Sequence, residues 1–305
     1  HMNTRKETVA FLLGGAAAAA MTMAGLTLGL GALSAAMVGV AALAGLPHGA
    51  LDPLVARDRG LWRTTPGLLV FSGVYVALAA VVVGVWMLSP VLSLAAFLLA
   101  SAWHFGDDGR DPGTLARFAI GGLIVCVPAL AHPQQTIEIY QIIGGAGAGK
   151  LVTAQAWLAP LCLIGSGVAV ASRVRVNLWL SIEIAATALF AVLLPPLIFF
   201  SVYFCLLHSP RHIRSVYGAV RHVPAGITAD YAIGLSALVL AAAAFGFVWL
   251  LPSVLAIEQA ILPVVFVGLA ALTAPHMLLI DARPERVLSQ RSRSALPTGV
   301  PNGLH

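Results

Sequence analysis

Residues 66–88 read PGLLVFSGVYVALAAVVVGVWML, a run that contains no charged side chain. A helix of about 20 apolar residues is long enough to cross the hydrocarbon layer of a bilayer, so this run predicts a membrane-spanning helix. The composition of the whole chain agrees, because its 305 residues are 59% hydrophobic and only 10% charged. Soluble domains carry about 25% charged residues. The sequence therefore predicts an integral membrane protein of the all-α class.

Further apolar runs lie on both sides of this segment and predict one polytopic helical bundle with about ten transmembrane helices. We expect helices at 8–28, 31–47, 66–88, 90–105, 115–131, 152–171, 176–194, 197–208, 231–251 and 259–280. Residues 1–2 resemble a remnant of cloning. Residues 3–285 are expected to form a single transmembrane helical domain, and residues 286–305 a disordered cytoplasmic tail.

The cationic residues predict the orientation of the bundle. An even number of spans places both termini on one side, and almost all Lys and Arg residues then fall on that side. They are Arg5, Lys6, Arg57, Arg59, Arg63, Arg110, Arg117, Arg173, Arg175, Arg211, Arg214, Arg221, Arg283, Arg286, Arg291 and Arg293, with Lys150 on the other side. Cytoplasmic loops are enriched in Lys and Arg, so we expect cytoplasmic termini and a multi-pass protein of the cell (inner) membrane. Cations in short loops, not on one face, argue against nucleic-acid binding.

Histidines end alternate apolar runs. His48, His104, His208 and His276 end the second, fourth, eighth and tenth expected spans, and His212 follows His208 by one helical turn. In the expected topology all of them lie in one layer at the cytoplasmic boundary. A neutral imidazole is a poor lipid-facing group and a good metal ligand. Any one of these histidines could be an interfacial polar cap, but the whole layer predicts a metal site inside the bundle.

The residue types around this layer narrow its chemistry. An all-imidazole set favours iron, copper or zinc over magnesium and calcium, which prefer oxygen ligands. Carboxylates often orient metal-bound histidines, and Asp52 and Asp107 lie close to histidines in the sequence, although either could simply pair with a nearby arginine. Pro210, between the paired histidines, predicts that their helix kinks or ends there.

An aromatic stretch leads into this histidine pair. Phe204 and Phe200 precede His208 by one and two helical turns and lie on its face of the helix. They could form an apolar wall for a long lipophilic substrate, or they could be packing residues. Residues 144–150, GGAGAGK, match the glycine and lysine pattern of a phosphate-binding loop, but Leu151 replaces the Ser or Thr that magnesium binding needs. We interpret them as a flexible connection or a partly re-entrant turn.

Four short motifs follow one another along the chain. They are PHGALD at 47–52, HFG at 104–106, YFCLLHSPRH at 203–212 and PHMLLID at 275–281. With these motifs the chain resembles the Brp/Blh family of bacteriorhodopsin-related β-carotene 15,15'-dioxygenases, over about residues 40–285. The apolar segment before residue 30 looks like an additional N-terminal span.

The resemblance implies a membrane oxidoreductase that uses non-haem Fe(II) and O₂ to cleave β-carotene at its central 15,15' double bond into two all-trans-retinal molecules. It implies that the iron ligands are His48, His104, His208 and His212, with no catalytic residue beyond them. Residues expected to support the ligands or line the substrate are Asp52, Asp107, Phe200, Tyr203, Phe204 and His276. Membrane lipid and a retinal-binding rhodopsin are the implied partners.

The residues alone are also compatible with other classes of protein. A different membrane oxidase of lipids or carotenoids could use the same layer, although di-iron desaturases carry more clustered histidines. A non-enzymatic histidine-lined transporter or rhodopsin partner could relay protons, although we expect no lysine or acidic residue in the middle of a span. A haem protein would need axial histidines that face each other across the bundle.

Overall fold

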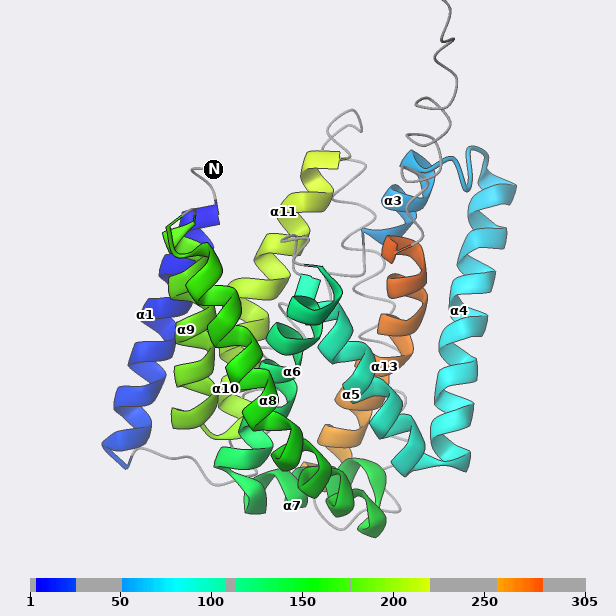
Figure 1. Cartoon of the computed structure of the whole chain (residues 1–305). Coiled ribbons are helices and arrows are strands. Elements are labelled where there is room, and N and C mark those ends of the chain that lie inside the picture. The colour runs from blue at the N-terminus through cyan, green and yellow to red at the C-terminus, as the bar shows by residue number, and fades with distance from the viewer. Residues whose placement is uncertain (1–3, 26–50, 108–112, 176, 220–256, 282–305) are drawn as a thin grey trace, which may run out of the picture.

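All secondary structure in the described part of the chain is helical, as the composition predicts (Figure 1). The computed structural model describes residues 4–25, 51–107, 113–175, 177–219 and 257–281. The first helices are α1 (Thr4–Met23), α3 (Asp52–Asp58), α4 (Thr65–Leu88), α5 (Pro90–Asp107), α6 (Thr114–Ala131) and α7 (Pro133–Gly144). They are followed by η1 (Ala146–Ala148), α8 (Gly149–Arg173), α9 (Leu178–Leu193), α10 (Pro196–Tyr203), η2 (Phe204–His208), α11 (Ser209–Ala219) and α13 (Ile257–Asp281).

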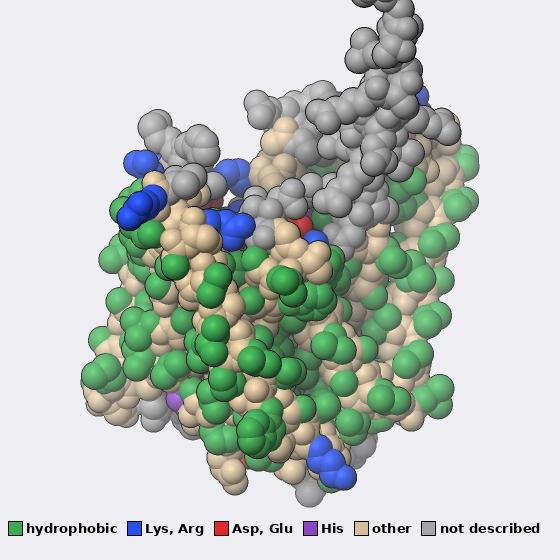
Figure 2. Space-filling model, viewed as in Figure 1, with side chains coloured by type: hydrophobic (Ala, Val, Ile, Leu, Met, Phe, Trp, Pro, Cys, Tyr) green, Lys and Arg blue, Asp and Glu red, His purple; other side chains and the backbone are tan. Residues whose placement is uncertain are grey.

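The exterior of the bundle is that of a membrane protein. Four helices within the described ranges are long and apolar enough to cross a bilayer: Thr65–Leu88, Thr114–Ala131, Ala146–Arg173 and Leu262–Ile280. Figure 2 shows a broad band of hydrophobic side chains across the face in view, with the Lys and Arg side chains gathered mainly above it. A soluble monomer rarely exposes so large an apolar surface, so these helices are suited to face lipid.

Most expected spans that can be compared coincide with a helix, and the differences have physical causes. The runs at 31–47 and 231–251 lie outside the described residues. Helices α3 and α7 are absent from the sequence-based expectation because each is too short to form an apolar run of spanning length. Both begin with a proline in the first turn, where the missing N–H is tolerated. Residues 144–150 form a tight turn at Gly145, then η1 and the start of α8.

The helix that carries the histidine pair does not end at Pro210. Segments α10, η2 and α11 follow one another without a break, and η2 is a π-helical turn in which the Ser209 N–H donates to the Phe204 carbonyl, five residues back. Pro210 then falls in the first turn of α11. Of the two expected outcomes, a kink or an end, the end does not occur, and a wider turn just before the proline accommodates the distortion that a proline causes in a regular α-helix.

Helices α5 and α6 approach each other closely through two glycines. A side chain at Gly121 would collide with the backbone carbonyl of Ala102, and one at Gly106 would collide with the carbonyl of Arg117. Small residues are the usual means by which membrane helices pack at short distance. This contact holds the C-terminal end of α5, which carries His104, inside the bundle.

Candidate metal site

Four imidazoles from different segments of the described chain meet inside the bundle. His104 lies in the last turn of α5, His208 ends η2, His212 lies in α11 and His276 lies near the end of α13. In Figure 1 α5, α13 and the α10–α11 segment all rise toward the same end of the molecule. The predicted histidine layer is therefore present for these residues, whereas His48 lies outside the described residues.

The imidazole rings form a contiguous cluster. The ring centroid of His104 lies 5.0 Å from that of His208 and 5.5 Å from that of His276. The ring centroid of His212 lies 4.8 Å from that of His276. His208 and His276 are almost fully buried, with 2% and 3% of their surface exposed. These two imidazoles are thus enclosed by protein, whereas His104 and His212 are half-buried.

The separation of each of three neighbouring ring pairs fits two imidazoles on one metal ion, and the ligand atoms that come within 4.8 Å of one another among the described residues are those of Asp52, His212 and His276. Two imidazoles bound to one ion through metal–nitrogen bonds of roughly 2.1 Å have ring centroids about 5 Å apart. The three centroid separations in the cluster lie between 4.8 and 5.5 Å. A set of neutral nitrogen donors suits iron, copper or zinc. The side chains present therefore match the kind of ion that the sequence predicts.

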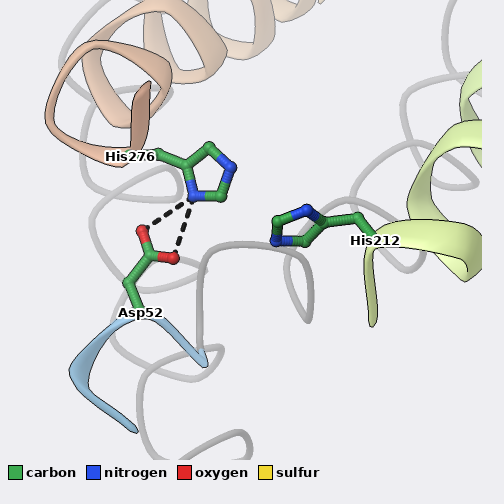
Figure 3. A group of neighbouring side chains, drawn as sticks. All are labelled: Asp52, His212 and His276. Carbon is green, nitrogen blue, oxygen red and sulfur yellow. Dashed lines mark hydrogen bonds and ion pairs between the residues drawn. The ribbon is translucent and has the colours of Figure 1, made fainter. Parts of the chain in front are cut away.

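Asp52 lies against His276, as Figure 3 shows. Nδ1 of His276 is 2.9 Å from Oδ1 and 3.0 Å from Oδ2 of Asp52. Asp52 is fully buried, and its Oδ2 also accepts a hydrogen bond of 2.8 Å from the hydroxyl of Tyr75 in α4. His212 extends toward this pair from α11, and one ligand atom each of Asp52, His212 and His276 lie within 4.8 Å of one another.

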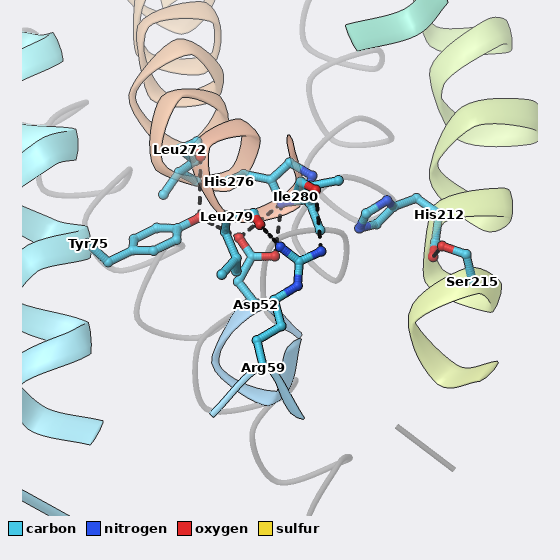
Figure 4. Close-up of polar contacts among 9 residues, drawn as sticks. All are labelled: Asp52, Arg59, Tyr75, His212, Ser215, Leu272, His276, Leu279 and Ile280. Carbon is cyan, nitrogen blue, oxygen red and sulfur yellow. Dashed lines mark hydrogen bonds and ion pairs between the residues drawn. The ribbon is translucent and has the colours of Figure 1, made fainter. Parts of the chain in front are cut away.

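Helix α3 holds the Asp52 carboxylate in this place (Figure 4). At its C-terminal end, Arg59 donates hydrogen bonds to the backbone carbonyls of Leu279 and Ile280, the latter at 3.3 Å. Leu279 and Ile280 lie in the last turn of α13, whose carbonyls have no partner within the helix, so a cation at this position is favourable. At its other end, the indole N–H of Trp62 donates to the carbonyl of Pro53 at 2.7 Å. The Arg59 contacts tie α3 to the end of α13 that carries His276, and the Trp62 contact ties the segment after α3 back to its first turn.

The structure places Asp107 in a different environment. Its carboxylate forms an ion pair of 3.4 Å with Arg117 of α6, and the guanidinium of Arg117 lies 3.8 Å from the centroid of the Trp103 ring. The Asp107 side chain is 25% exposed. This is the arginine-pairing alternative that the sequence left open, and it fastens α5 to α6 next to His104.

Aromatic rings enclose one side of the histidine cluster. The His208 ring contacts Phe105, Tyr203 and Phe204, with centroid separations of 4.8, 6.2 and 5.6 Å. Phe200 stacks on Phe204 at 5.3 Å and lies 5.7 Å from Phe266 of α13. The predicted aromatic wall on the helix face before His208 is therefore present, and it extends from the imidazoles to α13.

Several residues of this site are missing from the sequence-based candidates. Phe105 directly follows His104 in the sequence, and this adjacency is the signal that could have identified it as a residue of the site. Phe266 and Tyr75 each lie within an apolar run and have no local signal, because only the packing of α13 and α4 brings them to the site. Tyr75 and Asp52 are 23 residues apart, and Asp52 and His276 are 224 residues apart.

One sequence-based expectation is wrong. An acidic residue does stand inside a span, because Glu183 lies in the middle of α9 and is only 2% exposed. Arg211 neutralises it with hydrogen bonds of 3.0 and 2.6 Å to the two carboxylate oxygens, and Thr8 of α1 donates a third at 3.0 Å. The charge is therefore paired within the bundle, where it joins α9 to α11 and α1.

Fold and site together define an all-helical protein with a lipid-type exterior and an enclosed cluster of imidazoles. The chain belongs to the family described as beta-carotene 15,15'-dioxygenase, whose family model matches residues 38–282. This confirms the resemblance that the four motifs indicate.

Two curated relatives agree with this membership. The protein named beta-carotene 15,15'-dioxygenase from uncultured marine bacterium 66A03 is 30% identical over 256 residues, which cover 78% of this chain and 89% of that protein. The probable beta-carotene 15,15'-dioxygenase Blh of Halobacterium salinarum is 27% identical over 304 residues, which cover 86% and 88% of the two chains. No solved structure matches the chain.

Proposed function

We propose that the protein cleaves β-carotene at the central 15,15' double bond with O₂, yielding two molecules of all-trans-retinal, and that Fe(II) in the histidine cluster is its cofactor. The observation that carries this proposal is the convergence of imidazoles at metal-binding spacing in a chain of this family. Fe(II), when bound there, supplies the activation of O₂ that organic side chains cannot provide.

The proposed iron ligands are His48, His104, His208 and His212. The ring contact between His104 and His208 supports their membership of one set. The place of His212, one turn beyond His208 on the far side of the π-helical turn, supports a paired role for these two side chains. His48 lies outside the described residues, and its place in the set rests on the PHGALD motif alone.

The aromatic wall is the proposed contact surface for the substrate. β-Carotene is an apolar rod without hydrogen-bonding groups, so a binding surface gains affinity from apolar and aromatic contacts alone. Phe200, Phe204 and Phe266 provide such contacts in a row that leads to His208. The same rings keep water away from the imidazoles, which suppresses side reactions of an oxidising site.

We further propose that the protein is a multi-pass protein of the cell (inner) membrane, with about ten spans and cytoplasmic termini. A single helical domain over residues 3–285 and a cytoplasmic tail at 286–305 belong to this proposal. The concentration of cations at one end of the apolar band supports the orientation (Figure 2). A carotenoid dissolved in the bilayer can enter such a bundle laterally, and the retinal released could pass to a rhodopsin.

The direct test of the function is a turnover assay. Detergent-purified protein, loaded with iron, is incubated with β-carotene and O₂ while carotenoid absorbance and retinal are measured. We expect retinal at about two molecules per β-carotene consumed and roughly one iron per chain. Apocarotenals of unequal length would indicate a different carotenoid oxidase. Carotenoid binding without cleavage would indicate a non-enzymatic partner, and a Soret band would indicate haem.

A further inference from the structure

We propose that His276 is itself a metal ligand of this site, through Nε2, and that Asp52 and Tyr75 are the residues that position it. The inference rests on the proposed function, because it concerns the same metal. It adds a nitrogen donor from α13, and it assigns a role to a buried carboxylate and a tyrosine hydroxyl that the ligand set above leaves unused.

His276 contacts two other histidines of the cluster. Its ring contacts both His212, at a centroid separation of 4.8 Å, and His104, at 5.5 Å. These two histidines come from α11 and α5, and His276 joins them. A ligand atom of His276 lies within 4.8 Å of one of His212, close enough for the two side chains to share an ion.

Asp52 determines which ring nitrogen of His276 carries the hydrogen. Both oxygens of Asp52 flank Nδ1 of His276, at 2.9 and 3.0 Å. A carboxylate is an acceptor, so Nδ1 carries a hydrogen and donates a hydrogen bond to Asp52. The other nitrogen of a neutral imidazole, Nε2, then has its lone pair available, which is the form that binds metals. Figure 3 shows this second nitrogen on the side of the ring away from Asp52.

Asp52 is itself held in position by Tyr75. The Tyr75 hydroxyl donates to Oδ2 at 2.8 Å and lies 3.3 Å from the backbone carbonyl of Leu272, one turn before His276 on α13. Metal-bound histidines commonly have such a carboxylate on the second nitrogen, itself held by further hydrogen bonds. The chain Tyr75–Asp52–His276 has this arrangement, and it connects α4, α3 and α13 (Figure 4).

Asp52 could instead bind the metal directly, with His212 and His276, since their ligand atoms are mutually within 4.8 Å. The hydrogen bonds favour the positioning role, because both Asp52 oxygens lie on Nδ1 of His276 and one also accepts from Tyr75. These hydrogen bonds occupy about three of the roughly four lone-pair sites of the carboxylate, so direct coordination of an ion by Asp52 would compete with them. The two roles make different spectroscopic predictions.

The test is titration of the purified full-length protein with Co(II), followed by visible absorption bands that report the ligand set. His276→Ala is expected to weaken Co(II) binding at least tenfold and to change the bands, and added imidazole is expected to restore them. Tyr75→Phe and Asp52→Asn are expected to weaken binding by about 10–100-fold, with unchanged bands at saturating Co(II). His132→Ala, at a histidine that bonds to the Val192 carbonyl, is the matched control and keeps wild-type binding.

The outcomes separate this inference from the proposed function. Wild-type affinity and unchanged bands in His276→Ala would overturn the inference while leaving the metal site intact. Altered bands in saturated Asp52→Asn would make Asp52 a ligand and overturn its positioning role. Wild-type protein that binds neither Co(II) nor Fe(II) would contradict the proposed function itself. Tyr75→Phe removes only one oxygen atom, so its affinity can be read even if the other variants fold poorly.

Discussion

His208 shows how the site depends on single side chains. It is 2% exposed and is surrounded by the rings of His104, Phe105, Tyr203 and Phe204. Close packing of this kind restricts the imidazole to few orientations, which suits its proposed role as a metal ligand. Preorganisation of ligands in a dry site strengthens their electrostatic interaction with a cation.

Removal of either member of the histidine pair is expected to abolish iron retention and turnover together. His208→Ala and His212→Ala each take one donor from a site with few, and both properties depend on the same ion. Iron per chain, measured by mass spectrometry, and retinal formation are the readouts. Arg293→Ala, in the segment expected to be a tail, should match the wild type in both. Full activity in either histidine variant would remove that residue from the ligand set.

The aromatic wall is expected to act on the substrate and not on the metal. Phe200→Ala removes the ring that connects Phe204 with Phe266 and should lower kcat/KM for β-carotene roughly tenfold, in keeping with one lost aromatic contact. Iron content should stay at the wild-type level. Loss of iron in this variant would show that the ring supports the imidazoles instead of the polyene.

Between helices, polar contacts complement the apolar packing. Arg211 lies between the two paired histidines, and its ion pair with Glu183 fixes the rotation of α11 against α9. The neighbouring pair of Arg214 and Glu7 joins α11 to α1. Phe11 of α1 is fully buried against Phe190 and Tyr203. Helix α1, which the sequence suggests is an addition, is therefore part of the support for the histidine helix.

Breaking the ion pair is expected to destabilise the bundle. Glu183→Gln leaves the Arg211 charge without its buried partner, a change that typically costs about 3–5 kcal/mol. The thermal unfolding temperature in detergent should fall clearly, whereas Glu138→Gln, at an exposed position of α7, should leave it unchanged. The double variant Glu183→Gln with Arg211→Gln should be less destabilised than the sum of the single variants. Strict additivity would mean that the two side chains are energetically independent.

The contact between α5 and α6 gives a second prediction at this scale. Gly121→Ala places a methyl group where the Ala102 carbonyl lies, so the helices must separate, at a cost of roughly 1–3 kcal/mol. Gly84→Ala, in α4 with open space around it, is the matched control. Unfolding temperature measures both. Equal stability of the two variants would contradict the close approach of α5 and α6.

For the molecule as a whole, the apolar runs predict most of the helices and the histidine layer predicts the site. Long runs specify α4, α6 and α8 because a bilayer requires about 20 apolar residues for each crossing. Helices α3 and α7 escape this rule because they are short. The hydrogen bond between Asp52 and His276 cannot be predicted from apolar runs either, because the local sequence does not indicate which helix ends become neighbours. Glu183, in contrast, can be read directly from the run at 176–194, and only its pairing with Arg211 of α11 depends on the fold.

The orientation of the whole bundle can be tested by labelling. Lys150→Cys should react with a membrane-impermeant maleimide in intact cells, because this exposed residue is the cation predicted on the outer side. Arg63→Cys, exposed at the opposite end, should react only after permeabilisation. The reverse pattern would invert the topology and place the histidine cluster at the outer boundary.

X-ray absorption at the iron edge of the loaded protein tests whether imidazoles from separate helices bind one ferrous ion. We expect nitrogen neighbours at roughly 2.1 Å with the outer-shell scattering of imidazole rings and no second iron nearby. A pronounced iron–iron distance, sulfur neighbours or the absence of imidazole scattering would contradict it.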